Sequence, residues 1–102
     1  MKDVIDYRVR FKGVWGRNRS VKSDSYALRE DVPADAPLSD AAALALAEAH
    51  LRAIRAKDVV FTVVACPAEV EEYPAANGAP AYAVKRHCLF SYREVGRGSF
   101  HA

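Results

Sequence analysis

Hydrophobic and polar residues alternate almost perfectly over residues 3–12. One face of this segment is apolar and the other is charged, with Ile5, Tyr7, Val9 and Phe11 set against Asp6, Arg8, Arg10 and Lys12. A period of two in a segment rich in β-branched and aromatic residues predicts a strand with one buried face. Residues 13–20 contain two glycines and no period, which predicts a loop. A second strand is expected over about 22–30, with Tyr26 and Leu28 facing inward.

The middle of the chain predicts a connector followed by a helix. Two prolines within residues 31–37 exclude regular strand pairing there. Ser39 is a good N-cap, and from Asp40 to about Lys57 the composition is strongly helical, without glycine or proline. One apolar stripe of this helix is formed by Leu44, Ala47, Leu51 and Ile54, with Leu46 and Ala43 beside it.

The second half of the chain predicts another hairpin. Residues 59–66 are apolar on both faces, which is typical of a central strand. Pro67 is expected to interrupt this strand, and an extended path resumes at 69–73. The Asn-Gly dipeptide at 77–78 is the best turn signal in the chain. Alternation over residues 82–93 then predicts one last long strand.

Together these elements predict an α+β protein, a two-layer sandwich of order β-β-α-β-β. Four mainly antiparallel strands would form one sheet, and the helix would pack on one face because the apolar stripe and the inner faces of the strands bury each other. We expect a single domain over residues 1–95 and a flexible C-terminal tail over residues 96–102. An open sheet leaves edges, so the chain is expected to be a monomer or a homodimer paired through edge strands.

Composition limits what this fold can hold. Nineteen of the 52 hydrophobic residues are alanine, so the core is modest and leaves no room for a large buried active site. No segment approaches the roughly 18 apolar residues of a membrane span, and residues 1–6 lack the apolar region of a secretory signal. Arginine outnumbers lysine ten to five, a bias typical of GC-rich bacterial or phage genomes. We therefore expect a cytoplasmic protein of a bacterial cell that contacts no membrane.

The net charge of +2 hides a segregation of charge along the chain. Residues 8–22 carry six cations and no acid, whereas residues 30–48 carry five acids and no cation. If the first and last strands are neighbours, their outer faces form one basic face of the sheet, with Arg8, Arg10, Lys12, Lys85, His87 and Arg93. Such a face suits an anionic partner. Ordinary solvation of a sheet face is the alternative explanation.

The predicted loop carries the sharpest functional signal. Trp15, the only tryptophan, lies between two glycines and is followed by Arg17, Asn18 and Arg19. Tryptophan and arginine are the residue types most enriched at binding hot spots. The alternative is that Trp15 folds back as a lid over the small core.

The two cysteines are expected to face each other. A hairpin turning at 77–78 would place Cys66 opposite Cys88. Reduced and mostly buried thiols are the favoured interpretation for a cytosolic protein. A disulfide is the first alternative, although directly opposed strand cysteines often strain one. A metal site with His87 is the last, because the spacing matches no zinc motif.

No phosphate-binding glycine loop, nucleophile elbow or paired-histidine metal motif is present in the sequence, so we expect a non-enzyme without cofactor or metal. The favoured interpretation is a small protein-binding module that acts as a steric inhibitor or adaptor, with Trp15, Arg17, Asn18 and Arg19 as anchors and the basic face as rim. Its size suits a phage or mobile-element inhibitor of bacterial machinery, of the anti-CRISPR type. The alternative is direct binding of DNA or RNA by the basic face and the basic loop.

Overall fold

The computed structural model describes residues 1–88 and 91–101, with the side chains of all of these except residues 29–31. The described chain folds into five strands and one helix. They are β1 (Lys2–Trp15), β2 (Ser20–Pro33), α1 (Asp40–Ala53), β3 (Lys57–Tyr73), β4 (Tyr82–His87) and β5 (Arg93–Phe100). The prediction of a mainly antiparallel sheet accompanied by one helix is confirmed.

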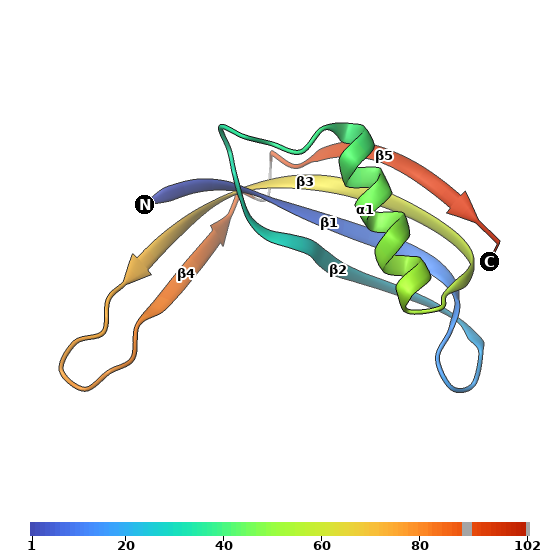
Figure 1. Cartoon of the computed structure of the whole chain (residues 1–102), viewed down its shortest axis with the longest axis horizontal. Helices are drawn as coiled ribbons and strands as arrows, with labels where there is room; N and C mark the ends of the chain where they lie inside the picture. The colour runs from blue at the N-terminus through green and yellow to red at the C-terminus, as the bar shows by residue number, and fades with distance from the viewer. Residues whose placement is uncertain (89–90, 102) are drawn as a thin grey trace.

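β3 is the strand around which the sheet is arranged. The strand order is β2-β1-β3-β4, and β5 also pairs with β3. β5 pairs with residues 59–65 of β3 and β4 pairs with residues 68–73, so the two strands follow each other along the same side of β3. The result is an open, curled sheet from which the β3–β4 hairpin extends as an arm (Figure 1).

Pro67 marks the point where the partner of β3 changes. The strand does not break there, contrary to the prediction, because Pro67 still pairs with Ile5 of β1. Its carbonyl accepts a hydrogen bond from the Cys88 N–H at 2.8 Å. Proline has no N–H to return that bond, so regular pairing with β4 ends beside it.

Helix α1 covers one face of the sheet and encloses the main core. Across β1 and β3 the register pairs Tyr7 with Ala65, Val9 with Val63 and Phe11 with Phe61, all of them buried. The helix contributes Ala43, Ala47 and Leu51 to the same cluster. Small alanine side chains let the helix lie close to the aromatic residues of the strands. The inward face predicted for the first strand is therefore confirmed.

The helix begins where the sequence predicts and ends earlier. The Ser39 hydroxyl accepts a hydrogen bond from the Ala42 N–H at 3.1 Å, as expected of an N-cap. The last helical residue is Ala53 instead of Lys57, and Ile54 is the C-cap. Ile54 is exposed and does not continue the buried stripe, because the chain turns away from the helix immediately after it.

The first predicted loop is shorter than expected. Residues 13–15 belong to β1, and only residues 16–19 form the turn. Gly13 packs against β3, where a Cβ atom would lie 2.9 Å from the Val59 Cγ2. This glycine therefore allows close packing between strands and does not break the strand. β2 likewise continues to Pro33, which pairs with Val4.

The end of the chain differs most from the prediction. A single strand over 82–93 is wrong: β4 ends at His87 and β5 begins at Arg93, and residues 89–90 lie outside the described residues. Residues 96–100, predicted as part of a flexible tail, pair with β3 as part of β5. Phe100 is buried, with its ring centroid 6.4 Å from that of Phe61. The sheet thus has five strands instead of four.

Gly98 makes this last strand sensitive to substitution. A Cβ atom at Gly98 would lie 2.4 Å from the Phe61 Cζ, and the two residues are paired in the sheet. We expect Gly98→Ala to lower the free energy of unfolding by about 1–3 kcal/mol, because the ring must leave its place. Ser99→Ala, at an exposed neighbour, should change it by less than about 0.5 kcal/mol. Urea denaturation measures both, and equal effects would contradict the packing role of Gly98.

Candidate binding site

Trp15 ends β1 and contributes to both the core and the surface. Its ring lies 4.8 Å from that of Phe11, centroid to centroid, and it packs against the main core cluster. The Lys22 Nζ lies 5.7 Å from the indole centroid, within range of a cation–π contact. The indole is half-buried and also lines a cavity. Trp15 therefore packs against the core, as the lid interpretation expects, and it also lines a cavity.

The turn after Trp15 holds an arginine in an unusual backbone conformation. Gly16 has a φ of 86° and Arg19 a φ of 46°, and the Arg19 N–H donates to the Gly16 carbonyl at 3.3 Å. Glycine adopts positive φ readily, but a residue with a Cβ atom is disfavoured there by roughly 1–2 kcal/mol. The turn therefore keeps a strained Arg19 beside the indole.

The end of helix α1 holds a second arginine in the same conformation. The Ala56 N–H donates to the Leu51 carbonyl at 3.1 Å, and the Arg55 N–H donates to the Arg52 carbonyl at 3.0 Å. These two bonds form a Schellman motif, in which the residue after the C-cap is left-handed and usually glycine. Here that residue is Arg55, with a φ of 60°.

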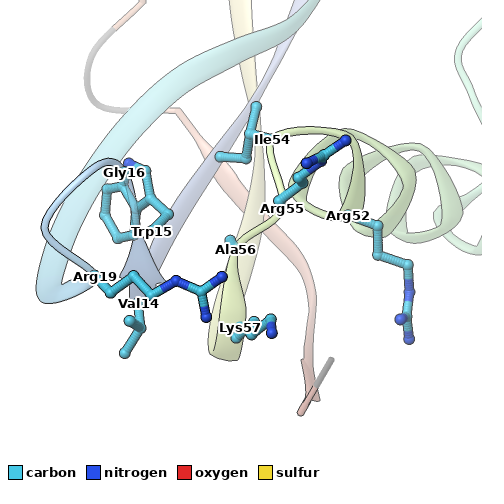
Figure 2. A pocket seen from close by; sticks show the side chains of 9 residues that line it. All are labelled: Val14, Trp15, Gly16, Arg19, Arg52, Ile54, Arg55, Ala56 and Lys57. Carbon is cyan, nitrogen blue, oxygen red and sulfur yellow. The ribbon is translucent and has the colours of Figure 1, made fainter.

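The two strained arginines line one cavity of about 630 Å³. We call it the Trp15 pocket, and Figure 2 shows it between the turn that follows β1 and the end of α1. The side chains that matter for its chemistry are Trp15, Arg19, Arg52, Ile54, Arg55 and Lys57. Arg19 extends from the turn toward the start of β3, whereas Arg52 points away from the indole (Figure 2) and lies over the Phe100 ring at 4.3 Å.

The Trp15 pocket is positively charged. Four cationic side chains and no acidic one are among the described residues that line it. Arg52 also approaches Glu48, with 3.5 Å between Nη2 and Oε1. Within residues 1–88 and 91–101, excepting the side chains of 29–31, Arg19, Arg55 and Lys57 form no ion pair. Cations gathered in a hollow concentrate a positive potential that attracts an anionic group.

Only two of the four residues predicted as anchors in the loop line the Trp15 pocket, and residues from other elements line it as well. Trp15 and Arg19 line the pocket, whereas Arg17 and Asn18 are exposed on the turn and are not among its lining residues. The contribution of Arg52, Arg55 and Lys57 to the pocket was not predicted from the sequence. Basic residues at a helix end complement the helix dipole, so their type gives no sign of a shared site.

The second predicted surface is the sheet face opposite α1. Arg8, Arg10 and Lys12 lie on this open face, and the register with β3 places Lys85 and His87 on it as well. It also holds Asp6, whose side chain is only 2% exposed. The Asp6 Oδ2 accepts from the Arg8 Nη1 at 3.2 Å and lies 2.7 Å from the His87 Nε2.

Arg93 does not belong to this open face, contrary to the prediction. It pairs with Ala65 of β3, which faces the helix side. Its guanidinium contacts the Asp40 carboxylate at the start of α1, at 3.2 and 3.4 Å. The expectation failed because β4 and β5 are separate strands, so the alternation of the first does not carry over into the second.

The cysteines do not oppose each other. The tight turn is confirmed, with a bridge between Ala76 and Ala79 and positive φ at residues 77 and 78. Its register pairs Ala68 with His87, so Cys88 lies beside Pro67 instead of Cys66. Both thiols are free; Cys66 is half-buried and Cys88 is exposed. Burial, followed by the nearby Asp6 carboxylate, raises the pKa of the Cys66 thiol above its ordinary value.

The described residues hold neither a metal-binding cluster nor a membrane-spanning helix. No three His, Cys, Asp or Glu side chains within residues 1–88 and 91–101 are grouped so that they could hold a metal ion. The described part of the chain also contains no helix long and apolar enough to cross a membrane. Comparison with protein-family models, curated proteins and solved structures finds no significant match to any of them.

Proposed function

We propose that this chain is a small, non-enzymatic protein-binding module that seats an acidic segment of a partner protein in the Trp15 pocket. One observation carries the proposal: two arginines keep unfavourable left-handed backbones, and both line the same cavity beside the only tryptophan. Strained residues cluster at functional sites, where the strain serves a purpose other than stability. Charge complementarity would orient the partner and speed association, as a steric inhibitor or an adaptor requires.

The shape of the site favours an acidic protein segment over a nucleic acid. Single-stranded nucleic acids are bound by grooves that follow the backbone and by several aromatic side chains that stack successive bases. Here the described cations are grouped around one hollow instead of along a groove, and the pocket offers a single indole.

Titration with an acidic peptide tests the proposal directly. The probe is a peptide of alternating glutamate and serine, and the same peptide with glutamine is the neutral control. Because Trp15 is the only tryptophan, its fluorescence reports occupation of the pocket. We expect saturable binding of the acidic peptide that weakens as salt rises, and binding at least about tenfold weaker for the neutral peptide.

Two arginines of the same turn provide a matched pair of variants. Arg19→Gln removes a cation that lines the pocket and should weaken the acidic peptide about tenfold. Arg17→Gln removes an exposed cation outside the lining and should weaken it less than about twofold. Equal losses would show diffuse attraction instead of a seated segment. Displacement of the peptide by an oligonucleotide, with a log–log salt slope near −0.7 per phosphate, would overturn the proposal in favour of nucleic-acid binding.

A further inference from the structure

A second basic cavity, on the open face of the sheet, is separate from the Trp15 pocket. Its volume is about 340 Å³, and it lies where β1, β3 and the end of β4 meet. The described residues that line it are Arg8, Arg10, Cys66, His87, Cys88 and Tyr92. We call it the open-face cavity. It shares no lining residue with the Trp15 pocket, so its function can be tested independently.

A buried carboxylate holds two side chains of the open-face cavity in place. Asp6 binds Arg8 and His87 through the same oxygen, Oδ2, while its own side chain is almost completely buried. A guanidinium has five N–H donors in a fixed fork, so Arg8 keeps donors that Asp6 does not occupy. Burying a carboxylate is costly unless it is paired. The buried Asp6 carboxylate therefore orients Arg8 and His87 at the wall of the cavity.

The second guanidinium is held by an aromatic ring. Arg10 follows Arg8 by two residues on the same face of β1, which separates the two by roughly 7 Å along the strand. Its Cζ lies 5.9 Å from the centroid of the Tyr92 ring, within range of a cation–π contact. Two arginines thus line one cavity, and each is positioned by a different neighbour.

No described residue that lines the cavity is acidic. The Cys88 thiol lies 3.2 Å from the Ser91 hydroxyl and is the donor in that contact. The raised pKa of Cys66 keeps its thiol neutral near pH 7. The walls therefore supply positive charge and hydrogen-bond donors to whatever occupies the cavity.

We propose that the open-face cavity binds a phosphate group. A carboxylate has two oxygens and is satisfied by one guanidinium fork, whereas a phosphate group can meet two forks at once. The cavity volume lies at the lower end of the range for small-molecule sites, which suits one phosphate and the group that bears it. The same chemistry is offered by a free phosphate, by a small phosphorylated molecule and by the backbone of a nucleic acid.

Titration of the intact protein followed by NMR tests this proposal and distinguishes the sources. Inorganic phosphate is one probe, an oligodeoxythymidylate is the other, and sodium chloride at matched ionic strength is the control. We expect saturable shifts of the Cys66, His87 and Tyr92 amide signals with at least one probe. A response to inorganic phosphate supports a free or monoester ligand, and a response to the oligonucleotide alone supports a backbone phosphate. No saturable response to either would overturn the proposal.

Three cations of β1 provide the variants for this test. Arg10→Gln should weaken phosphate binding about tenfold, because it removes one fork. Lys12→Gln removes a cation from the same face but outside the cavity, and should weaken binding less than about twofold. Arg8→Lys keeps the charge beside Asp6 and removes the planar fork, so it should weaken binding as Arg10→Gln does. Equal losses in Arg10→Gln and Lys12→Gln would show general charge attraction and contradict a built site.

Discussion

Glycine in place of both Arg19 and Arg55 is expected to raise the melting temperature of the protein and to weaken its binding of the acidic peptide. Both residues have left-handed backbones, with φ of 46° and 60°. Glycine removes the steric cost of this conformation but loses more backbone entropy on folding. The net gain is about 0.5–1 kcal/mol per site. For a domain of this size, about 1 kcal/mol corresponds to a rise of roughly 4–8 °C.

The same substitutions remove two guanidinium groups from the Trp15 pocket. Affinity for the acidic peptide should therefore fall by at least about tenfold. Glutamine at both positions separates the two effects, because it keeps the backbone strain and removes the charge. The glutamine pair should lose affinity with no gain in melting temperature. Calorimetry measures the stability of each variant, and Trp15 fluorescence measures the affinity.

Asn77→Gly is the matched control for the backbone effect. Asn77 also has a positive φ, of 50°, but it lies at the tip of the arm and outside the Trp15 pocket. Its replacement should leave peptide affinity unchanged. If glycine at Arg19 and Arg55 lowered the melting temperature instead, these arginines would be stabilising the fold. That result would contradict the proposal that these two arginines serve binding.

Arg8→Met combined with His87→Leu is expected to lower the free energy of unfolding by about 3–5 kcal/mol. The two substitutions leave the Asp6 carboxylate without its partners in a place where its side chain is 2% exposed. Its other oxygen, Oδ1, is already buried with no hydrogen-bond partner among the described residues. A buried charge that has lost its partners keeps the full cost of leaving water.

Adding Asp6→Val to this double variant should restore most of the stability. Replacing a whole buried polar group by apolar residues of similar shape is often close to neutral, so we expect the triple variant within about 1 kcal/mol of the original protein. Lys12→Met combined with Ser99→Leu, at exposed positions of the same face, should cost less than about 0.5 kcal/mol. Urea denaturation of the original protein and of the double, triple and control variants measures these free energies of unfolding. A triple variant as unstable as the double would show that packing, and not the stranded carboxylate, causes the loss.

The parts of the fold that depend on neighbours in sequence were predictable. The alternation of β1, the Ser39 cap and the Asn-Gly turn are all set by local preferences, and all are confirmed. The end of the helix and the division between β4 and β5 were not. They depend on the hydrogen bonds after Ile54 and on Pro67, which lacks the donor needed to continue the ladder to β4. Residues 96–100 were expected to belong to a tail because they lie near the end of the chain. In the structure Gly96 and Gly98 leave room there for Leu44 and Phe61.

Only part of the candidate site could be predicted from the sequence. Trp15 and Arg19 stood out because tryptophan and arginine are enriched at binding hot spots and lie together here in a segment with two glycines. Arg55 and Lys57 did not stand out, because cations at the end of a helix have an ordinary electrostatic explanation. Only the folded chain brings the helix end against the turn. The left-handed backbones of Arg19 and Arg55 could not be predicted from the sequence, because arginine ordinarily avoids this conformation.

By itself, the sequence determined that this protein has an antiparallel sheet, one helix and a basic first hairpin, because hydrophobic period, capping and charge are properties of short segments. The tertiary structure decided which cations share a cavity. It placed Arg93 with Asp40 on the helix side, Arg8 beside a buried carboxylate and Arg10 beside the Tyr92 ring. It also brought Arg19 and Arg55 to one cavity. Register explains the position of Arg93, since a shift of one residue moves a side chain to the other face of a sheet. The register here is set by contacts between segments that are far apart in the chain.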